Sequence, residues 1–278
     1  MKKISRRSFM AAAAVSVAAL AMTACGGSAS SAASSVASSA ASSEAVSSAA
    51  TAELTTVEAG KLTMATNAAF PPYEMTTDAG EFEGIDVDTA KAIAEKLGLE
   101  LQIDDMDFDA ALLSVQQGKA DIVMAGVTVT DERKAVMDFS DSYATGIQSI
   151  IVPNDSDIAS PDDLAGKKIG TQRGTTGYIY CSDDFGDENV VAYDDGLTAV
   201  QALNNGQVDA VVIDNAPAQE FVVANPGLKV LDTSYAEEDY AIGMAKGSAL
   251  EDAVNKALEE LKADGTLQAI VDKYINAN

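Results

Sequence analysis

Two segments of the sequence resemble each other and lead to residues of opposite charge. Residues 111–126 (ALLSVQQGKADIVMAG) and 199–214 (AVQALNNGQVDAVVID) each read as a helix, a Gly stop, a polar turn and a buried strand. Arg133 follows the first copy, and Asp214 ends the second. Ligands of open parallel sheets bind outside the carboxyl ends of the strands, so we expect these side chains to face one cleft. The alternative is chance similarity between two copies of a common helix–strand unit.

Arg and Asp on opposite walls of a cleft would suit a zwitterion such as an amino acid. The planar guanidinium of Arg133 can bind a carboxylate through two donors, which the ammonium of Lys cannot do. Asp214 can bind an ammonium group, and Thr128 and the Gly126 carbonyl are further acceptors nearby. Residues 174–177 (GTTG) precede a predicted helix, so their free N–H groups and the helix dipole would favour an anion.

Each of these residues also has a purely structural explanation. Arg133 could pair with Asp131 or Asp138 at the surface. Asp214 could cap the helix that follows it, and Gly174 could serve only as a turn residue. We favour a binding site because the residues fall at the ends of predicted strands in matching order.

The elements that must position these residues alternate between strand and helix from residue 61 onward. Predicted strands cover 61–66, 99–103, 120–126, 146–152, 167–171, 190–193, 208–214 and 240–246. Predicted helices cover 85–98, 108–118, 175–185, 196–206 and 216–225, and two more close the chain. Short helices between strands predict α/β lobes with mostly parallel sheets.

The N-terminus reads as an export signal followed by an anchor. Residues 1–24 combine a basic start (KKISRR) with an apolar run that is too short to span a membrane as a helix. The small residues before Cys25 resemble a bacterial lipobox, in which the Cys receives fatty acyl chains such as palmitate and becomes the N-terminus. Two acyl chains would give stable anchoring. A plain signal peptide with a chance Cys is the alternative, and SRRSFM leaves the choice between general and twin-arginine export open.

Composition narrows the possible partners. Residues 25–53 contain Cys25 and a Ser- and Ala-rich stretch, which predicts a flexible tether. The formal net charge of −25 disfavours nucleic acid and anionic lipid as partners, and we expect the lipid anchor to be the only contact with a membrane. The chain has no His, and Cys181 is its only Cys besides Cys25. We therefore expect no internal disulfide, no Cys-based metal site, no imidazole metal ligand and no His-based catalysis, and we assign no catalytic residue, metal or cofactor.

Four stretches resemble the polar amino-acid-binding proteins of ABC importers, the extracellular solute-binding proteins of family 3. These stretches are NAAFPPYE (67–74), GIDVD (84–88), MDF (106–108) and AGVTVTDERK (125–134) with DFS (138–140). The resemblance runs from about residue 60 to the C-terminus. It implies a two-lobed fold like that of the type II periplasmic binding proteins, with a cleft that closes over one amino acid.

The resemblance also implies boundaries for the lobes. Lobe 1 would comprise residues 54–142 and 243–278, and lobe 2 would comprise residues 148–238. Two hinge strands, at 143–147 and 239–242, would join them. Lobe 1 would therefore be discontinuous in sequence.

The resemblance assigns roles to ten residues of this sequence. Arg133, with the backbone N–H groups of Thr128 and Thr176, would bind the ligand carboxylate. Asp214, with the Gly126 carbonyl and the Thr128 hydroxyl, would bind the ligand ammonium. The ligand side chain would lie between the aromatic rings of Phe70 and Phe108. Its far end would contact Asn67, Glu74 and Gln172.

The chain departs from familiar specificity patterns at two of these positions. Many relatives carry Asp where this chain has Asn67, and well-studied glutamine binders carry Lys where it has Gln172. The identity of the amino acid and the preference for the L or the D form therefore stay open.

The implied function is that of a monomeric receptor, anchored on the outer face of the cytoplasmic membrane. It would deliver a polar L-amino acid to an ABC permease and its ATPase subunits. The alternatives are a lyase on the same scaffold and a ligand-sensing module. The lack of His and of a second catalytic-looking carboxylate in the motifs argues against an enzyme.

Overall fold

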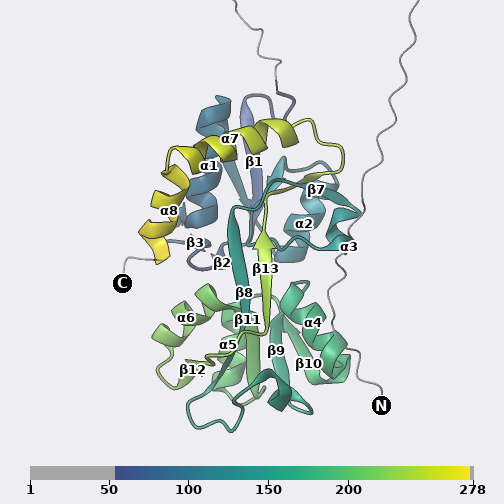
Figure 1. The fold of residues 1–278 in the computed structure, drawn as a ribbon, viewed down its shortest axis with the longest axis vertical. Coiled ribbons are helices and arrows are strands. Elements are labelled where there is room, and N and C mark those ends of the chain that lie inside the picture. Colours follow the sequence, from purple (N-terminus) through teal and green to yellow (C-terminus); the bar gives the residue numbers. More distant parts are fainter. Residues whose placement is uncertain (1–53, 276–278) are drawn as a thin grey trace, which may run out of the picture. The chain divides into compact units, whose positions relative to one another are not determined.

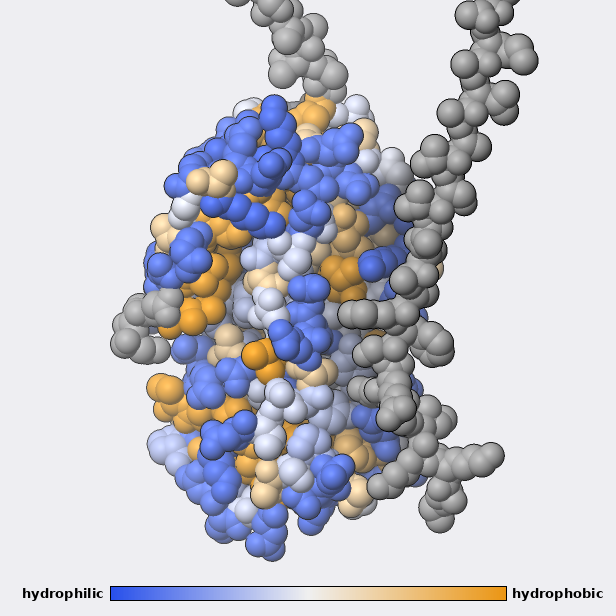
Figure 2. Space-filling model, viewed as in Figure 1, coloured by the Kyte–Doolittle hydropathy of each residue, from blue (hydrophilic) through white to orange (hydrophobic). Residues whose placement is uncertain are grey.

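The computed structural model describes residues 54–275. The expected export signal at 1–24 and the segment 25–53, with Cys25, lie outside the described residues, so the predictions about them stay predictions. Within the described range, no helix is long and apolar enough to cross a lipid bilayer. Figure 2 shows charged and polar residues over much of one face, as the formal net charge of −25 leads one to expect.

Two open sheets define two lobes (Figure 1). In lobe 1 the strand order is β5 (Glu100–Asp105), β1 (Lys61–Thr66), β6 (Ile122–Val123), β14 (Gly243–Ala245) and β7 (Met137–Phe139). In lobe 2 it is β10 (Val190–Tyr193), β9 (Ile169–Gln172), β11 (Ala210–Asp214), β8 (Ala144–Pro153) and β12 (Leu228–Val230), with β13 (Ala236–Tyr240) also paired to β8. A small third sheet contains β2 (Ala69–Phe70), β3 (Glu74–Thr76) and β4 (Phe82–Glu83).

Helices pack against both sheets. Those of lobe 1 are α1 (Ile85–Leu97), α2 (Phe108–Gln116), α3 (Asp131–Lys134), α7 (Glu251–Ala263) and α8 (Thr266–Ile275). Those of lobe 2 are α4 (Thr176–Phe185), α5 (Gly196–Asn204) and α6 (Asn215–Ala224), with short 3₁₀ turns at Pro161–Leu164 and Asp187–Asn189. The apolar spacing explains these helices: in α7, Val254, Leu258 and Leu261 form a buried stripe against the core.

The two-lobed α/β class is confirmed, and in each of the two large sheets all strands but one run in the same direction. Each sheet has a parallel set of three strands, β5-β1-β6 in lobe 1 and β10-β9-β11 in lobe 2. The other neighbours in these sheets pair antiparallel. Every antiparallel pair involves the one reversed strand of its sheet, β14 in lobe 1 or β8 in lobe 2, and each of these strands follows a crossing of the chain from the other lobe.

The prediction of one long strand at 240–246 is wrong. β13 ends at Tyr240 in the lobe 2 sheet, and β14 begins at Gly243 in the lobe 1 sheet. The chain changes sheets between these points, so no single strand can form. The strand expected at 120–126 is likewise reduced to β6, Ile122–Val123.

The chain crosses between the lobes twice, in two paired strands. β8 carries it into lobe 2 and β13 carries it back, side by side and antiparallel (Figure 1). Ala144 pairs with Tyr240, and Gly146 pairs with Glu238. A Cβ at Gly146 would overlap the ring of Tyr240, so glycine is needed for that ring to lie across β8.

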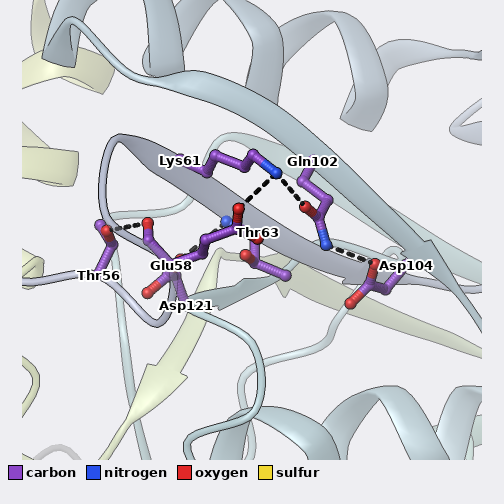
Figure 3. Close-up of polar contacts among 7 residues, drawn as sticks. All are labelled: Thr56, Glu58, Lys61, Thr63, Gln102, Asp104 and Asp121. Carbon is purple, nitrogen blue, oxygen red and sulfur yellow. Dashed lines mark hydrogen bonds and ion pairs between the residues drawn. The ribbon is translucent and has the colours of Figure 1, made fainter.

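The repeated segments share a structural role at the other end of the sheets. Asp121 accepts hydrogen bonds from the backbone N–H groups of Val57 (2.7 Å) and Thr63 (2.8 Å), and Figure 3 shows it beside Thr63. The aligned Asp209 accepts from the Lys168 N–H at 2.8 Å. Each carboxylate therefore binds the start of the neighbouring strand, away from the carboxyl ends where a ligand would bind.

Candidate ligand-binding site

A cavity of about 310 Å³ lies where the two lobes meet. It is lined by Asn67, Phe70, Glu74, Phe108, Ala125, Gly126, Thr128, Arg133, Gln172, Thr175, Thr176 and Asp214. All ten residues to which the sequence assigned a ligand role are therefore brought together, with Ala125 and Thr175 in addition.

Arg133 is a buried cation. It is 9% exposed, and its guanidinium lies 5.3 Å from the centre of the Phe108 ring. Nη1 donates to the Thr128 carbonyl at 2.8 Å, and Nη2 donates to the Gly174 carbonyl at 3.2 Å. Burial lowers the pKa of Arg133, and the carboxylate of Glu238 opposes this shift. Two of its five N–H hydrogens are used in these bonds, which leaves donors for an anion.

The surface explanation for Arg133 is wrong. Among the described residues no carboxylate lies within ion-pair distance of its guanidinium. Asp138 instead pairs with Lys246 at 2.6 Å, and Asp131 is exposed in the first turn of α3. The charge of Arg133 is therefore buried without a carboxylate partner from the described chain, which is costly unless an anion binds there.

Asp214 is a buried carboxylate on the opposite lobe. It occupies the position before α6, but its side chain makes no capping hydrogen bond, so the helix-cap explanation is wrong. Its Oδ1 accepts from the Tyr240 hydroxyl, and its Oδ2 accepts from Gln148 Nε2 at 2.8 Å. Burial raises the pKa of Asp214 to about 7. A cation beside it would favour the ionised form.

The backbone around Gly126 and at the start of α4 shapes the same cavity. Gly126 has a φ of 56°, and a Cβ there would lie 2.8 Å from the Phe70 ring, so only glycine fits. Its N–H donates to Asp86 Oδ2 at 3.0 Å. The Thr175 hydroxyl caps α4 by accepting from the Tyr178 N–H, and Thr175 and Thr176 both line the cavity.

At one end of the cavity, two amides connect the lobes. Gln172 Nε2 donates to Asn67 Oδ1 at 2.8 Å and to the Asp194 carbonyl at 3.3 Å. Asn67 Nδ2 donates to the Met106 carbonyl at 3.0 Å. Both amide hydrogens of Gln172 are therefore used, and its Oε1 is the group that can still bind a ligand. This group is an acceptor.

Glu74 adds a buried carboxyl group to the same cavity. Its side chain is fully buried, and neither carboxylate oxygen has a hydrogen-bond partner among the described residues. Burial raises the pKa of Glu74 well above its ordinary value, and the nearby charge of Asp86 adds to the shift. Burial also raises the pKa of Asp86, to about 6.

The aromatic residues divide between the cavity and the core. Phe70 and Phe108 line the cavity, each 6% exposed. Tyr73, whose role the sequence left open, is buried between Phe70 and Tyr240, with ring centres 5.9 Å and 5.2 Å away, and does not line the cavity. Cys181 is fully buried in α4, where burial raises the pKa of its thiol to about 12.

Sequence reasoning missed two buried polar residues on the crossing strands. Gln148 on β8 is 1% exposed and Glu238 on β13 is 7% exposed. Gln148 Nε2 donates to Asp214 Oδ2 and, at 3.0 Å, to Glu238 Oε2. Glu238 lies in the sequence AEEDY, which reads as a surface strand, and no local signal separates it from its acidic neighbours.

The described residues contain no group of three or more His, Cys, Asp or Glu side chains that could hold a metal ion. A two-lobed α/β fold with a polar cavity where the lobes meet defines a solute-binding protein of the periplasmic-binding-protein class. The chain belongs to the bacterial extracellular solute-binding proteins, family 3, whose sequence profile matches residues 62–277. This is a family of binding proteins.

Three proteins illustrate the similarity. The L-cystine-binding protein TcyJ of Escherichia coli K12 is 33% identical over 225 residues, which cover 80% of this chain and 85% of TcyJ. The arginine-, lysine-, histidine-binding protein ArtJ of Geobacillus stearothermophilus superposes with a TM-score of 0.75 at 34% identity, over 78% of this chain and 96% of ArtJ. An ancestral arginine-binding protein bound to glutamine superposes with a TM-score of 0.74 at 42% identity, over 78% and 98% of the two chains.

Proposed function

We propose that this protein is a membrane-tethered receptor that binds a polar L-amino acid and delivers it to the permease and ATPase subunits of an ABC importer. The observation that carries the proposal is the presence of Arg133 and Asp214 in one cavity, one from each lobe. Arg133, with the N–H groups of Thr128 and Thr176, binds the α-carboxylate. Asp214, with the Gly126 carbonyl and the Thr128 hydroxyl, binds the α-ammonium.

The far end of the cavity favours a side chain that donates hydrogen bonds. Gln172 offers Oε1, and the Glu74 carboxyl group lines the same cavity. A side chain that ends in an amide, guanidinium, imidazole or ammonium could donate to Gln172 Oε1, whereas a ligand carboxylate could not. The relatives' names point the same way, because cystine, arginine, lysine, histidine and glutamine all carry a donor at that position. Phe70 and Phe108 flank the stem of the ligand.

Closure of the lobes follows from the same contacts. The bonds from Arg133 to Gly174 and from Gln172 to Asn67 already join lobe 1 to lobe 2. A ligand held by both lobes adds contacts that exist only when the lobes are together, so its binding favours the closed state. We propose that residues 143–147 and 239–242 act as the hinge between lobes with the boundaries given above.

Export and anchoring rest on the sequence before residue 54. Acylation of Cys25 would hold the protein at the outer face of the cytoplasmic membrane, and residues 26–53 would let the monomeric receptor reach the permease. Metabolic labelling with palmitate tests this: the intact chain should be labelled and found with membranes. The Cys25→Ser chain should be neither labelled nor found with membranes. A labelled Cys25→Ser chain would overturn the assignment.

Ligand binding is tested with the chain from residue 26 onward, without acyl groups. Thermal shift against the twenty L-amino acids and L-cystine, followed by calorimetry on the hits and their D forms, should give a response from donor-bearing side chains. Glutamate and aspartate should bind weakly or not at all. A chain that responds to none of these compounds would overturn the amino-acid-binding function, and turnover of a bound compound would favour the enzyme alternative.

A further inference from the structure

Glu238 is a buried acid on a strand whose neighbouring acids are exposed. On β13, Glu237 and Asp239 are exposed, whereas Glu238 is 7% exposed and points inward. Its Oε1 has no hydrogen-bond partner among the described residues. Burying a carboxylate in this way costs stability, so the position calls for an explanation beyond the fold.

The other carboxylate oxygen of Glu238 contacts both lobes at once. Oε2 lies 3.1 Å from the hydroxyl of Thr128 in lobe 1 and 2.9 Å from the hydroxyl of Thr176 in lobe 2. It also accepts from Gln148 Nε2 at 3.0 Å. Both threonines line the cavity, whereas Glu238 does not. Glu238 therefore acts behind the cavity wall and reaches a ligand only through these hydroxyls.

The direction of these hydrogen bonds follows from the chemistry of the groups. A hydroxyl has one hydrogen to donate and two lone pairs to accept, whereas an ionised carboxylate can only accept. The two hydroxyls also lie 3.4 Å from each other, but the contacts to Glu238 Oε2 are shorter, at 3.1 Å and 2.9 Å, so each threonine donates its single hydrogen to Glu238. Toward the cavity each hydroxyl is then an acceptor only, which suits an ammonium and repels a carboxylate.

We propose that Glu238 is a positioning residue that orients the Thr128 and Thr176 hydroxyls as acceptors and so selects the α-ammonium of the ligand. The inference rests on the proposed function, because it assigns the ammonium to this part of the cavity. It also limits Thr176: its hydroxyl cannot donate to the ligand carboxylate, so only its N–H can do so.

Gln148 connects Glu238 to Asp214 through hydrogen bonds. Its Nε2 donates one hydrogen to Asp214 Oδ2 and the other to Glu238 Oε2. The amide thus holds two carboxylates beside the same part of the cavity. The Asp214 carboxyl group and the two threonine hydroxyls are therefore held in place by hydrogen bonds within the protein, before any ligand binds.

The test compares three variants of the chain from residue 26. Glu238→Met removes both acceptor oxygens with little change in length, Glu238→Gln keeps one acceptor and loses the charge, and Glu237→Met is the control on the exposed face of β13. Calorimetry uses L-arginine, L-lysine, L-histidine, L-glutamine and L-cystine, each beside the analogue without α-ammonium, such as 5-guanidinopentanoate for arginine. Thermal unfolding checks that each variant is folded.

Glu238→Met should weaken binding of the amino acid by about tenfold to a hundredfold, because it removes the acceptor that orients both hydroxyls. Its binding of the analogue without ammonium should change less than about threefold, because that analogue does not use the oriented hydroxyls. Glu238→Gln should lie nearer the wild type, and Glu237→Met should match it. Equal loss in Glu238→Met and Glu238→Gln would show that charge alone matters and would overturn the proposal.

A double-mutant cycle with Thr128→Val gives an independent measure and serves if Glu238→Met does not fold. Without the Thr128 hydroxyl, Glu238→Gln or Glu238→Met should cost several-fold less affinity than in the wild type. Additive losses would overturn the positioning role while leaving the receptor function intact. Failure of the wild type to bind any of the five amino acids would overturn both.

Discussion

Arg133 of lobe 1 donates through Nη2 to the carbonyl of Gly174 in lobe 2, 3.2 Å away. The same guanidinium lines the cavity and has no carboxylate partner among the described residues. One side chain therefore serves both the proposed binding of the ligand carboxylate and the contact between lobes. Loss of Arg133 should affect affinity and closure together.

Replacement of Arg133 should separate the effect of charge from that of geometry. Arg133→Ala should weaken amino-acid binding by about 2–5 kcal/mol, because it removes one partner of a buried charge-assisted pair. Arg133→Lys should fall between the wild type and Arg133→Ala, since Lys keeps the charge but not the two-pronged donor. Calorimetry measures both, and Lys134→Ala, at an exposed neighbour, is the control. Unchanged affinity in Arg133→Ala would contradict the assignment.

Binding should depend on pH through Asp214. The pKa of Asp214 is raised to about 7 by burial, and an ammonium binds the carboxylate rather than the acid. Affinity should therefore fall as the pH drops below about 7, by up to about tenfold per pH unit. Asp214→Asn should bind weakly at all pH values and lose this dependence. A pH-independent affinity in the wild type would count against the role of Asp214.

The stability of the ligand-free protein should fall as the pH rises, whereas its affinity for the amino acid should increase. A carboxyl group whose pKa is higher in the folded than in the unfolded state stabilises the fold below its unfolded pKa and loses that contribution as the pH rises through its folded pKa. For Asp86 and Asp214 the folded values are about 6 and about 7. Unfolding free energy in urea should therefore fall between about pH 4 and pH 7. Asp86→Asn should reduce the slope, and a stability that rises over this window would contradict the assignment.

The close approach of β8 and Tyr240 gives a steric test of the crossing strands. In Gly146→Ala the new methyl group would overlap the Tyr240 ring, whose hydroxyl donates to Asp214. We expect weaker amino-acid binding, by about tenfold, as this hydrogen bond is displaced. Gly227→Ala, where a Cβ meets nothing within 4 Å, is the matched control and should bind like the wild type. Equal affinities in both variants would show that the Tyr240 contact has no role in binding.

The repeated aspartates should matter for stability but not for binding. Asp121→Ala removes the acceptor for two backbone N–H groups, at Val57 and Thr63, and should cost about 1–3 kcal/mol of unfolding free energy. Asp209→Ala removes the acceptor for the exposed Lys168 N–H and should cost less. Chemical denaturation measures both losses. A large change in amino-acid affinity would contradict a purely structural role.

Local pattern was sufficient for much of the fold. The apolar stripe of α7 and the Gly stop after α1 follow from spacing along the chain, because a helix buries one face and ends where the backbone turns left-handed. The same reasoning placed Arg133 and Asp214 after buried strands, and the motifs around them pointed to one site. These features depend on neighbours in sequence, so the sequence contains them.

Only the tertiary structure decided which distant groups share the cavity wall and what they can still bind. Gln172 and Asn67 were both expected to face the ligand, yet they bond to each other, and both amide hydrogens of Gln172 are used within the protein. Glu238 reads as a surface acid, but the antiparallel pairing of β13 with β8 buries it against Thr128 and Thr176. Sequence thus determined the elements and the residue types at their ends. The partners of each polar group were decided by strand direction and lobe crossing, because hydrogen bonds join atoms that meet in space regardless of their separation along the chain.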